Sequence, residues 1–122
     1  MAQIKSSVKN SIVKTIRYLQ KQITITEVIL FGSYAAGTQH KHSDIDIAVI
    51  SPDFENKDIN FRAAISSKAK INGSIDVEIH PFTLKSLKNV RPTNFIGHIL
   101  KTGTIYFQRR RFSGIAPIAS LP

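Results

Sequence analysis

The sequence predicts a mixed α/β (α+β) domain: a small mixed β-sheet with helices packed on one face and a polar, open second face. Three observations support this. An apolar repeat at helical spacing comes first, three short runs rich in β-branched residues follow, and two of those runs alternate apolar with charged residues. The 122 residues, 42% hydrophobic, suit one compact domain with a real core. We expect it to span residues 1–108, followed by a flexible, basic and then apolar tail over residues 109–122.

The N-terminal segment is predicted to be an amphipathic helix, because its apolar residues recur at steps of three or four with basic residues between them. These apolar residues are Ile4, Val8, Ile12, Ile16, Leu19 and Ile23. The next run, ITEVILFG, predicts a buried strand that ends near Phe31 and turns at Gly32. Small residues from Ser33 to about Gly37 allow a short helix, and the polar stretch TQHKHS then leads to the next strand.

The second strand begins at Asp44 and ends at Ser51-Pro52. A helix is predicted next over NKDINFRAAISSKAKING, with Asp58 or Asn56 as its N-cap and Asn72-Gly73 as a left-handed stop.

The third strand is SIDVEIHPF, whose alternation places Ile75, Val77 and Ile79 on an apolar face and Asp76, Glu78 and His80 on a polar one. Two short helices, TLKSLKNV and NFIGHILKTG, and a last strand, TIYFQ, complete the predicted domain.

Charge and composition limit the kinds of partner, cross-link and compartment that we expect for this protein. The net charge of +9 and the pI near 10.1 favour a polyanionic partner such as nucleic acid, and equally a solvated basic surface. The chain has no cysteine, which excludes disulfides and thiolate metal sites and is compatible with a reducing compartment. Neither a membrane-spanning stretch nor a secretory signal is recognisable, so we expect a cytoplasmic protein without a membrane partner.

Two carboxylates stand out in the second strand, where Asp44 and Asp46 point to the same side with Cα atoms about 6.6 Å apart. If the three strands share a sheet whose apolar face is covered by helices, Asp76 joins them on the open face. Such carboxylates repel one another until a divalent cation binds. Oxygen ligands alone favour Mg²⁺ or Mn²⁺, and a triphosphate completes the coordination of Mg²⁺.

The turn before these strands is suited to phosphate. Gly32 lets the backbone approach a ligand closely, and the amides beginning at Ser33, with its hydroxyl, open a helix.

The pattern Gly-Ser, Gly and Asp-x-Asp in GSYAAGTQHKHSDIDIAVI resembles the signature of the DNA polymerase beta-like nucleotidyltransferase superfamily, in its minimal nucleotidyltransferase (MNT) branch. The resemblance runs from the first strand to TIYF. It implies the nucleotidyltransferase fold and transfer of a nucleoside monophosphate from ATP or another nucleoside triphosphate to an acceptor hydroxyl, with two Mg²⁺ ions. By this resemblance Asp44 and Asp46 hold both metals, Asp76 ligates the catalytic metal and accepts the proton, and Gly32 and Ser33 hold the β and γ phosphates.

One position departs from the family pattern. Members commonly carry a basic residue just before the second glycine, where this chain has Ala36. His40, Lys41 or His42 in the following loop are candidates to replace that charge.

The resemblance also suggests a partner. MNT proteins of this size often resemble the antitoxin of a toxin–antitoxin pair, transferring AMP to a HEPN-family ribonuclease. The acceptor hydroxyl is then that of a protein, with RNA as the other acceptor that the basic charge suggests. The alternative from a different class is a non-catalytic basic module that neutralises a partner or binds nucleic acid, which Ala36 and the +9 charge favour.

Several residues have simpler interpretations. Asp44 and Asp46 alone fit a solvated sheet face as well. Glu78 is the second candidate for the third carboxylate, although a rim ion pair with a lysine is the expectation. His80 and His98 are interpreted as structural or surface residues, and Tyr34 either stacks on a base or packs against the sheet.

Overall fold

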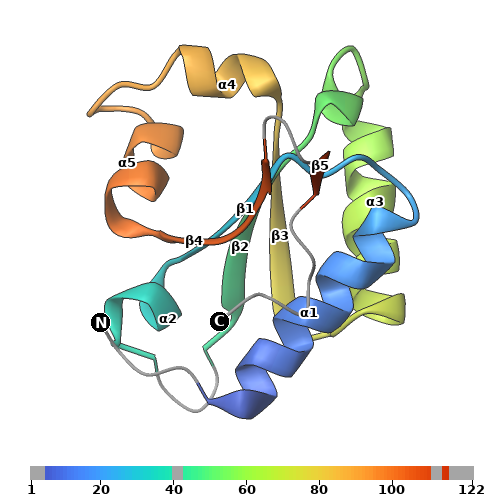
Figure 1. The fold of residues 1–122 in the computed structure, drawn as a ribbon, viewed down its shortest axis with the longest axis vertical. Helices are drawn as coiled ribbons and strands as arrows, with labels where there is room; N and C mark the ends of the chain where they lie inside the picture. Colours follow the sequence, from blue (N-terminus) through green and yellow to red (C-terminus); the bar gives the residue numbers. More distant parts are fainter. Residues whose placement is uncertain (1–4, 40–42, 111–113, 116–122) are drawn as a thin grey trace.

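The computed structural model describes residues 5–39, 43–110 and 114–115, and in these the chain forms a mixed sheet of five strands in the order β3-β2-β1-β4-β5 (Figure 1). The strands are β1 (Glu27–Phe31), β2 (Ile45–Ile50), β3 (Val77–Phe82), β4 (Thr104–Arg110) and β5 (Gly114–Ile115). The helices are α1 (Ser6–Gln20), α2 (Ser33–Ala36), α3 (Ile59–Asn72), α4 (Leu84–Lys88) and α5 (Phe95–Thr102), with a 3₁₀ turn at Pro52–Phe54.

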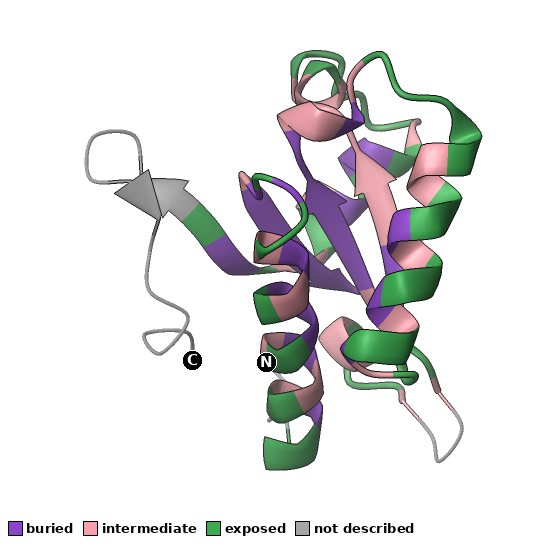
Figure 2. Cartoon of the chain, turned by 90° about the vertical axis from the view of Figure 1, so that its right-hand side faces the viewer, coloured by how far each residue is buried: buried purple, intermediate pink, exposed green. Residues whose placement is uncertain are grey.

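Helices α1 and α3 cover one face of the sheet, as predicted. The apolar stripe of α1 contributes Val8, Ile12, Ile16 and Leu19 to the main core, and α3 contributes Ile65 and Ala69. Figure 2 shows that both helices have buried positions on their inner sides and exposed positions on their outer sides. The stripe is buried because every third or fourth residue of a helix returns to the same side.

Helices α4 and α5 cover part of the other face of the sheet. Ile29, Phe31, Ala48 and Ile50 pack there with Ile96 and Ile99 of α5, and Leu84 and Leu87 of α4 lie against the same cluster. Next to this cluster Asp44 is exposed, and Asp46 and Glu78 are half-buried. The open, polar face of the prediction is therefore the part of this face that α4 and α5 leave uncovered.

Strand pairing sets the register of that face. Strand β1 is antiparallel to both β2 and β4, whereas β2 and β3 run parallel. All five residues of β1 are buried, which agrees with the predicted buried strand ending at Phe31. Because β1 is central and β3 is an edge strand, the polar side chains of β2 and β3 lie near one edge of the sheet.

The third strand starts later than predicted, and the placement of Ile75 was wrong. Ser74, Ile75 and Asp76 form a turn, in which the Asp76 N–H donates to Ser74 Oγ at 3.3 Å and the Val77 N–H to the Ser74 carbonyl at 3.3 Å. This turn keeps Ile75 out of the ladder, and its side chain is 69% exposed. Asp76 therefore precedes β3.

The caps of α3 were partly predicted. The Asp58 carboxylate accepts the Phe61 N–H at 3.1 Å, so Asp58 is the N-cap. The predicted left-handed stop is wrong, because Gly73 has φ −101°. A Cβ at Gly73 would lie 2.6 Å from the Ala69 carbonyl oxygen and 2.9 Å from Thr15 Cα, so the glycine serves the close approach of α1 instead.

The C-terminal strand continues beyond TIYFQ. Strand β4 runs to Arg110 and pairs with β5, so residues 109, 110, 114 and 115 of the expected tail are paired in a sheet. Residues 111–113 and 116–122 lie outside the described part of the chain, as do His40, Lys41 and His42. Among the described helices none has the length and apolar character needed to cross a membrane.

Candidate active site

The turn between β1 and α2 is built around a glycine conformation. Gly32 has φ 76° and ψ −152°, a backbone region that side chains other than hydrogen rarely permit. A Cβ at this position would lie 2.7 Å from Asp46 Oδ2. Strand pairing explains the proximity, since Phe31, the residue before the turn, is the register partner of Asp46. The glycine thus allows the turn to sit directly against a carboxylate of β2.

Ser33 begins α2 immediately after this turn. The Ala36 N–H donates to the Gly32 carbonyl at 3.0 Å, and the Thr38 N–H donates to the Ser33 carbonyl at 2.9 Å. These bonds close one short helical turn and end it at Gly37, which has a left-handed conformation with φ 77°. Ala36 is exposed.

Asp46 lies in β2, whereas Asp44, the predicted first residue of that strand, lies one residue before it. Ile45 and Ile47, which alternate with them, are buried in the core beneath α1 and α3, so the Asp46 side chain is directed to the other face. Its side chain is 29% exposed. Asp44 precedes the first residue of β2 and is exposed.

His80 contacts Asp46, which the sequence interpretation missed. His80 Nε2 lies 3.2 Å from Asp46 Oδ1, and because an ionised carboxylate only accepts hydrogen bonds, Nε2 is the donor in that state. The ring of His80 is also edge-on to Phe31, with centroids 4.9 Å apart, and 6.0 Å from the ring of Phe95. The signal was present in the alternation that placed His80 on the polar face of the third strand.

The aromatic residues around His80 connect the site to α5. Phe95 contacts Phe31 at 5.6 Å and Phe82 at 5.9 Å between ring centroids, and it is 51% exposed. This packing holds the imidazole on one side while Asp46 holds it on the other. The orientation of the Asp46 carboxylate is consequently tied to an apolar cluster.

Asp76 lies beside the start of β2. The Ile45 N–H donates to the Asp76 carbonyl at 2.9 Å, and Ile45 pairs with Val77 in the parallel ladder. Asp76 is exposed, and it lines a cleft of about 190 Å³ together with Tyr34, Ser43 and the first two turns of α1. Tyr34 also packs against the main core, in agreement with the packing alternative.

Glu78 faces Asp46 directly across the β2–β3 ladder. Its carboxylate pairs with Lys70 of α3 at 2.9 Å. The expectation of a rim ion pair for Glu78 is confirmed.

The donor set can be compared with the needs of a divalent cation. Within residues 5–39, 43–110 and 114–115 no three His, Cys, Asp or Glu side chains are close enough to hold a metal ion together. The structure brings Asp46, His80 and Gly32 together, but it does not gather Asp44, Asp46 and Asp76 into one group of ligands. Two carboxylates two residues apart still suit Mg²⁺, which commonly takes one or two carboxylates and completes its shell with water and phosphate oxygens.

Comparisons with known proteins show which family this chain resembles. The polymerase beta nucleotidyltransferase family matches residues 13–112. A curated relative, protein adenylyltransferase MntA of Shewanella oneidensis, is 36% identical over 78 residues, covering 63% of this chain and 53% of its own length. The chain thus spans about half the length of that relative.

Two solved structures have similar folds. One, from Sulfolobus solfataricus and assigned as a nucleotidyltransferase, superposes with a TM-score of 0.55 at 21% identity, covering 95% of this chain and 97% of that one. The other is a toxin–antitoxin complex with AMP-PNP, with a TM-score of 0.52 at 26% identity over 80% of this chain and 70% of that one.

Proposed function

This chain belongs to the polymerase beta nucleotidyltransferase family, and on that premise we propose that it transfers AMP from ATP to a hydroxyl of a protein acceptor. We propose a HEPN-type toxin as both partner and acceptor, with this chain as the antitoxin. The adenylyltransferase relative and the similar toxin–antitoxin complex with AMP-PNP support the nucleotide and the type of system. The HEPN identity of the partner follows from the resemblance to MNT proteins.

The single observation that carries the proposal is the contact of the Gly32 turn with Asp46. A hydrogen in place of a side chain leaves the backbone of the turn next to Asp46 Oδ2. A triphosphate held by Gly32 and Ser33 would therefore lie beside the carboxylate that holds its counterion. This juxtaposition of phosphate-binding turn and acidic strand is what nucleotidyl transfer requires.

Each site residue has a proposed role. Asp44 and Asp46 would hold two divalent cations. Asp76 would ligate one of them by the resemblance to the family, although the described residues do not bring the three carboxylates together. When bound, these ions neutralise charge on the entering and leaving oxygens of the displacement. Asp76 accepts the proton of the acceptor hydroxyl as its oxygen bonds to the α-phosphorus, the bond to the bridging oxygen breaks, and pyrophosphate leaves. Because Asp76 belongs to a turn rather than to β3, the alternation of side chains along the strand does not fix the direction of its carboxylate.

The test is transfer of label from α-labelled ATP, with Mg²⁺, to a purified HEPN-type toxin offered as the acceptor. Asp44→Asn and Asp46→Asn should abolish labelling, and Asp76→Asn should reduce it by about 10²- to 10⁴-fold, the usual size of a general-base contribution. Glu78→Gln is the matched control, because Glu78 lies on the same face but is paired with Lys70. It should retain labelling.

The alternative is neutralisation of the partner by contact alone, which Ala36 and the charge of +9 favour. This alternative would be established if the Asp44→Asn variant, which transfers no label, inhibited the toxin as potently as the parent protein. Loss of labelling in Glu78→Gln with retention in Asp76→Asn would instead exchange the roles of these two carboxylates.

A further inference from the structure

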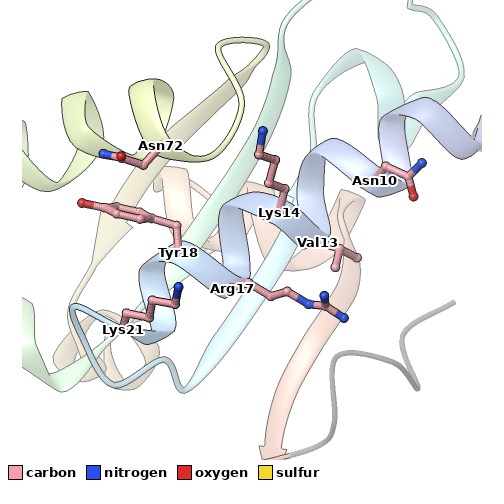
Figure 3. Close-up of a pocket in the computed structure, with 7 residues that line it drawn as sticks. All are labelled: Asn10, Val13, Lys14, Arg17, Tyr18, Lys21 and Asn72. Atoms are coloured by element: carbon pink, nitrogen blue, oxygen red, sulfur yellow. The ribbon is translucent and has the colours of Figure 1, made fainter.

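A groove on the outer surface of α1 lies apart from the acidic site. It has a volume of about 670 Å³ and is lined from α1 and from the end of α3 (Figure 3). Its residues are Asn10, Val13, Lys14, Arg17, Tyr18, Lys21 and Asn72. Figure 3 shows Tyr18 and Asn72 at one end of the groove and Val13 and Asn10 at the other. Among the residues that the structure describes, no carboxylate lines the groove.

The groove carries three cations, Lys14, Arg17 and Lys21. Lys14, Arg17 and Lys21 are exposed, and among the described residues none of them has a carboxylate oxygen within 4.0 Å. The sequence explains this, because Glu27 is the first acidic residue of the chain. Three uncompensated charges along one helix face attract a polyanion.

Both the groove and the cleft that contains Asp76 are lined by residues of α1. Ser7 and Ser11 of α1 line that cleft, and Lys14, Tyr18 and Lys21 line the groove. These five residues are separated by steps of four, three, four and three, so they form one stripe along the helix, about 21 Å long at 1.5 Å per residue. A chain-like ligand can follow this stripe from the groove to the cleft.

We propose that the groove binds a single-stranded nucleic acid along its sugar–phosphate backbone. Lys14, Arg17 and Lys21 neutralise successive phosphates, and the amides of Asn10 and Asn72 donate to phosphate or sugar oxygens. The ring of Tyr18, which is half-buried, offers a stacking surface for a base. An acidic protein surface needs the cations only, whereas amides and an aromatic ring among the cations match a nucleotide chain. This inference does not depend on the proposed transfer reaction.

The test is anisotropy of a fluorescently labelled single-stranded RNA titrated with the full chain, at about 50 mM and about 200 mM salt. Three phosphate contacts give a slope of about −2 in log affinity against log salt, which is a loss of about 20-fold over this range. The triple variant Lys14→Gln, Arg17→Gln, Lys21→Gln should bind at least about tenfold more weakly at the lower salt and lose most of the slope. Glutamine preserves helix propensity, and circular dichroism checks the fold.

The matched control removes the same charge elsewhere. Lys88, Arg91 and Lys101 are exposed residues of α4, the following turn and α5, and their replacement by glutamine again removes two lysines and one arginine. This control should bind the RNA within about twofold of the parent protein. Tyr18→Leu should weaken binding several-fold without changing the salt slope.

Three results would overturn the proposal. One is unchanged RNA affinity in the groove variant. Another is an equal loss in the control variant, which would make the effect one of net charge. A third is competition by polyglutamate as strong as by unlabelled RNA of equal length, which would assign the groove to acidic proteins.

Discussion

At the scale of single residues, Gly32 and Asp46 depend on each other. Two features of Gly32 exclude a side chain at this position. Its φ is positive, which strains any other residue, and a Cβ would lie only 2.7 Å from Asp46 Oδ2. Gly37 shares the positive φ, at 77°, but its ψ of 19° lies in the left-handed region that asparagine also adopts. The two glycines therefore allow the same substitution to be compared.

Gly32→Asn should lower the free energy of unfolding by about 1–3 kcal/mol and Gly37→Asn by under about 1 kcal/mol. Gly32→Asn adds strain and forces Asp46 away, whereas Gly37→Asn requires little change of the backbone. Urea denaturation of both variants measures the difference. Equal losses at the two sites would show that the space beside Asp46 does not matter.

His80 is the second residue whose role depends on Asp46. Its Nε2 contacts Asp46 Oδ1, so it orients the carboxylate that we propose as a metal ligand. Loss of such an outer partner typically costs about 10- to 100-fold in metal affinity. We expect His80→Ala to raise the Mg²⁺ concentration needed for half-maximal activity by that factor.

His80→Gln supplies a donor again and should recover part of this affinity. His98→Ala is the control, because His98 is exposed on α5. A Mg²⁺ titration that is unchanged in His80→Ala, with a lowered melting temperature, would mean that the histidine only packs against Phe31 and Phe95.

At the scale of elements, β1 carries an acidic residue in a buried position. Glu27 begins the strand and lies between Ile50 of β2 and Gln108 of β4. Burial raises the pKa of Glu27 above its usual 4.5, and a hydrogen bond from Gln108 opposes that shift only in part. The folded state thus binds this proton more tightly than the unfolded state, and the contribution of Glu27 to stability falls as the pH rises from 4.5 through its folded pKa.

Glu27→Gln should therefore be more stable than the parent chain at neutral pH, and the gain should vanish below about pH 4. Glutamine keeps a partner for Gln108 without a charge. Urea midpoints across this pH range measure the difference. Glu78 lies at the surface and pairs with Lys70, so Glu78→Gln should show no gain in stability. A gain of equal size in this control would mean that net charge, rather than burial, causes the effect.

The elements themselves were largely predictable because their signals are local. The period of α1, the β-branched run of β1 and the Asp58 cap each act within a few residues. The errors came where another part of the molecule decides. A glycine is required at position 73 because Thr15 of α1 packs against it. Ile75 was predicted to lie in the third strand, but the turn at Ser74 delays the start of that strand until Val77.

At the scale of the whole molecule, the acidic site should couple stability to its ligands. A ligand that binds only the folded state, at about 100 times its dissociation constant, adds about 2.7 kcal/mol. Mg²⁺ with ATP should therefore raise the melting temperature by roughly 10 °C for a domain of this size. ATP with a chelator should give a much smaller rise.

Asp46→Asn should remove the shift caused by Mg²⁺ and ATP, while Glu78→Gln keeps it. Differential scanning fluorimetry of the three proteins makes this comparison. A shift of the same size in the presence of a chelator would indicate that ATP binds without the metal, for instance through the basic groove of α1.

The sequence by itself determined the helix and strand types and the Gly-Ser turn that precedes the acidic strand, because periodicity and turn chemistry are properties of neighbouring residues. Only the tertiary structure decided that His80, 34 positions away, bonds to Asp46, that α4 and α5 pack on the same face of the sheet as Asp46, and that Asp76 lies in a turn beside β2. These contacts depend on the parallel register of β2 and β3 and on how helices pack across the sheet. Neither is encoded in any short stretch of the chain.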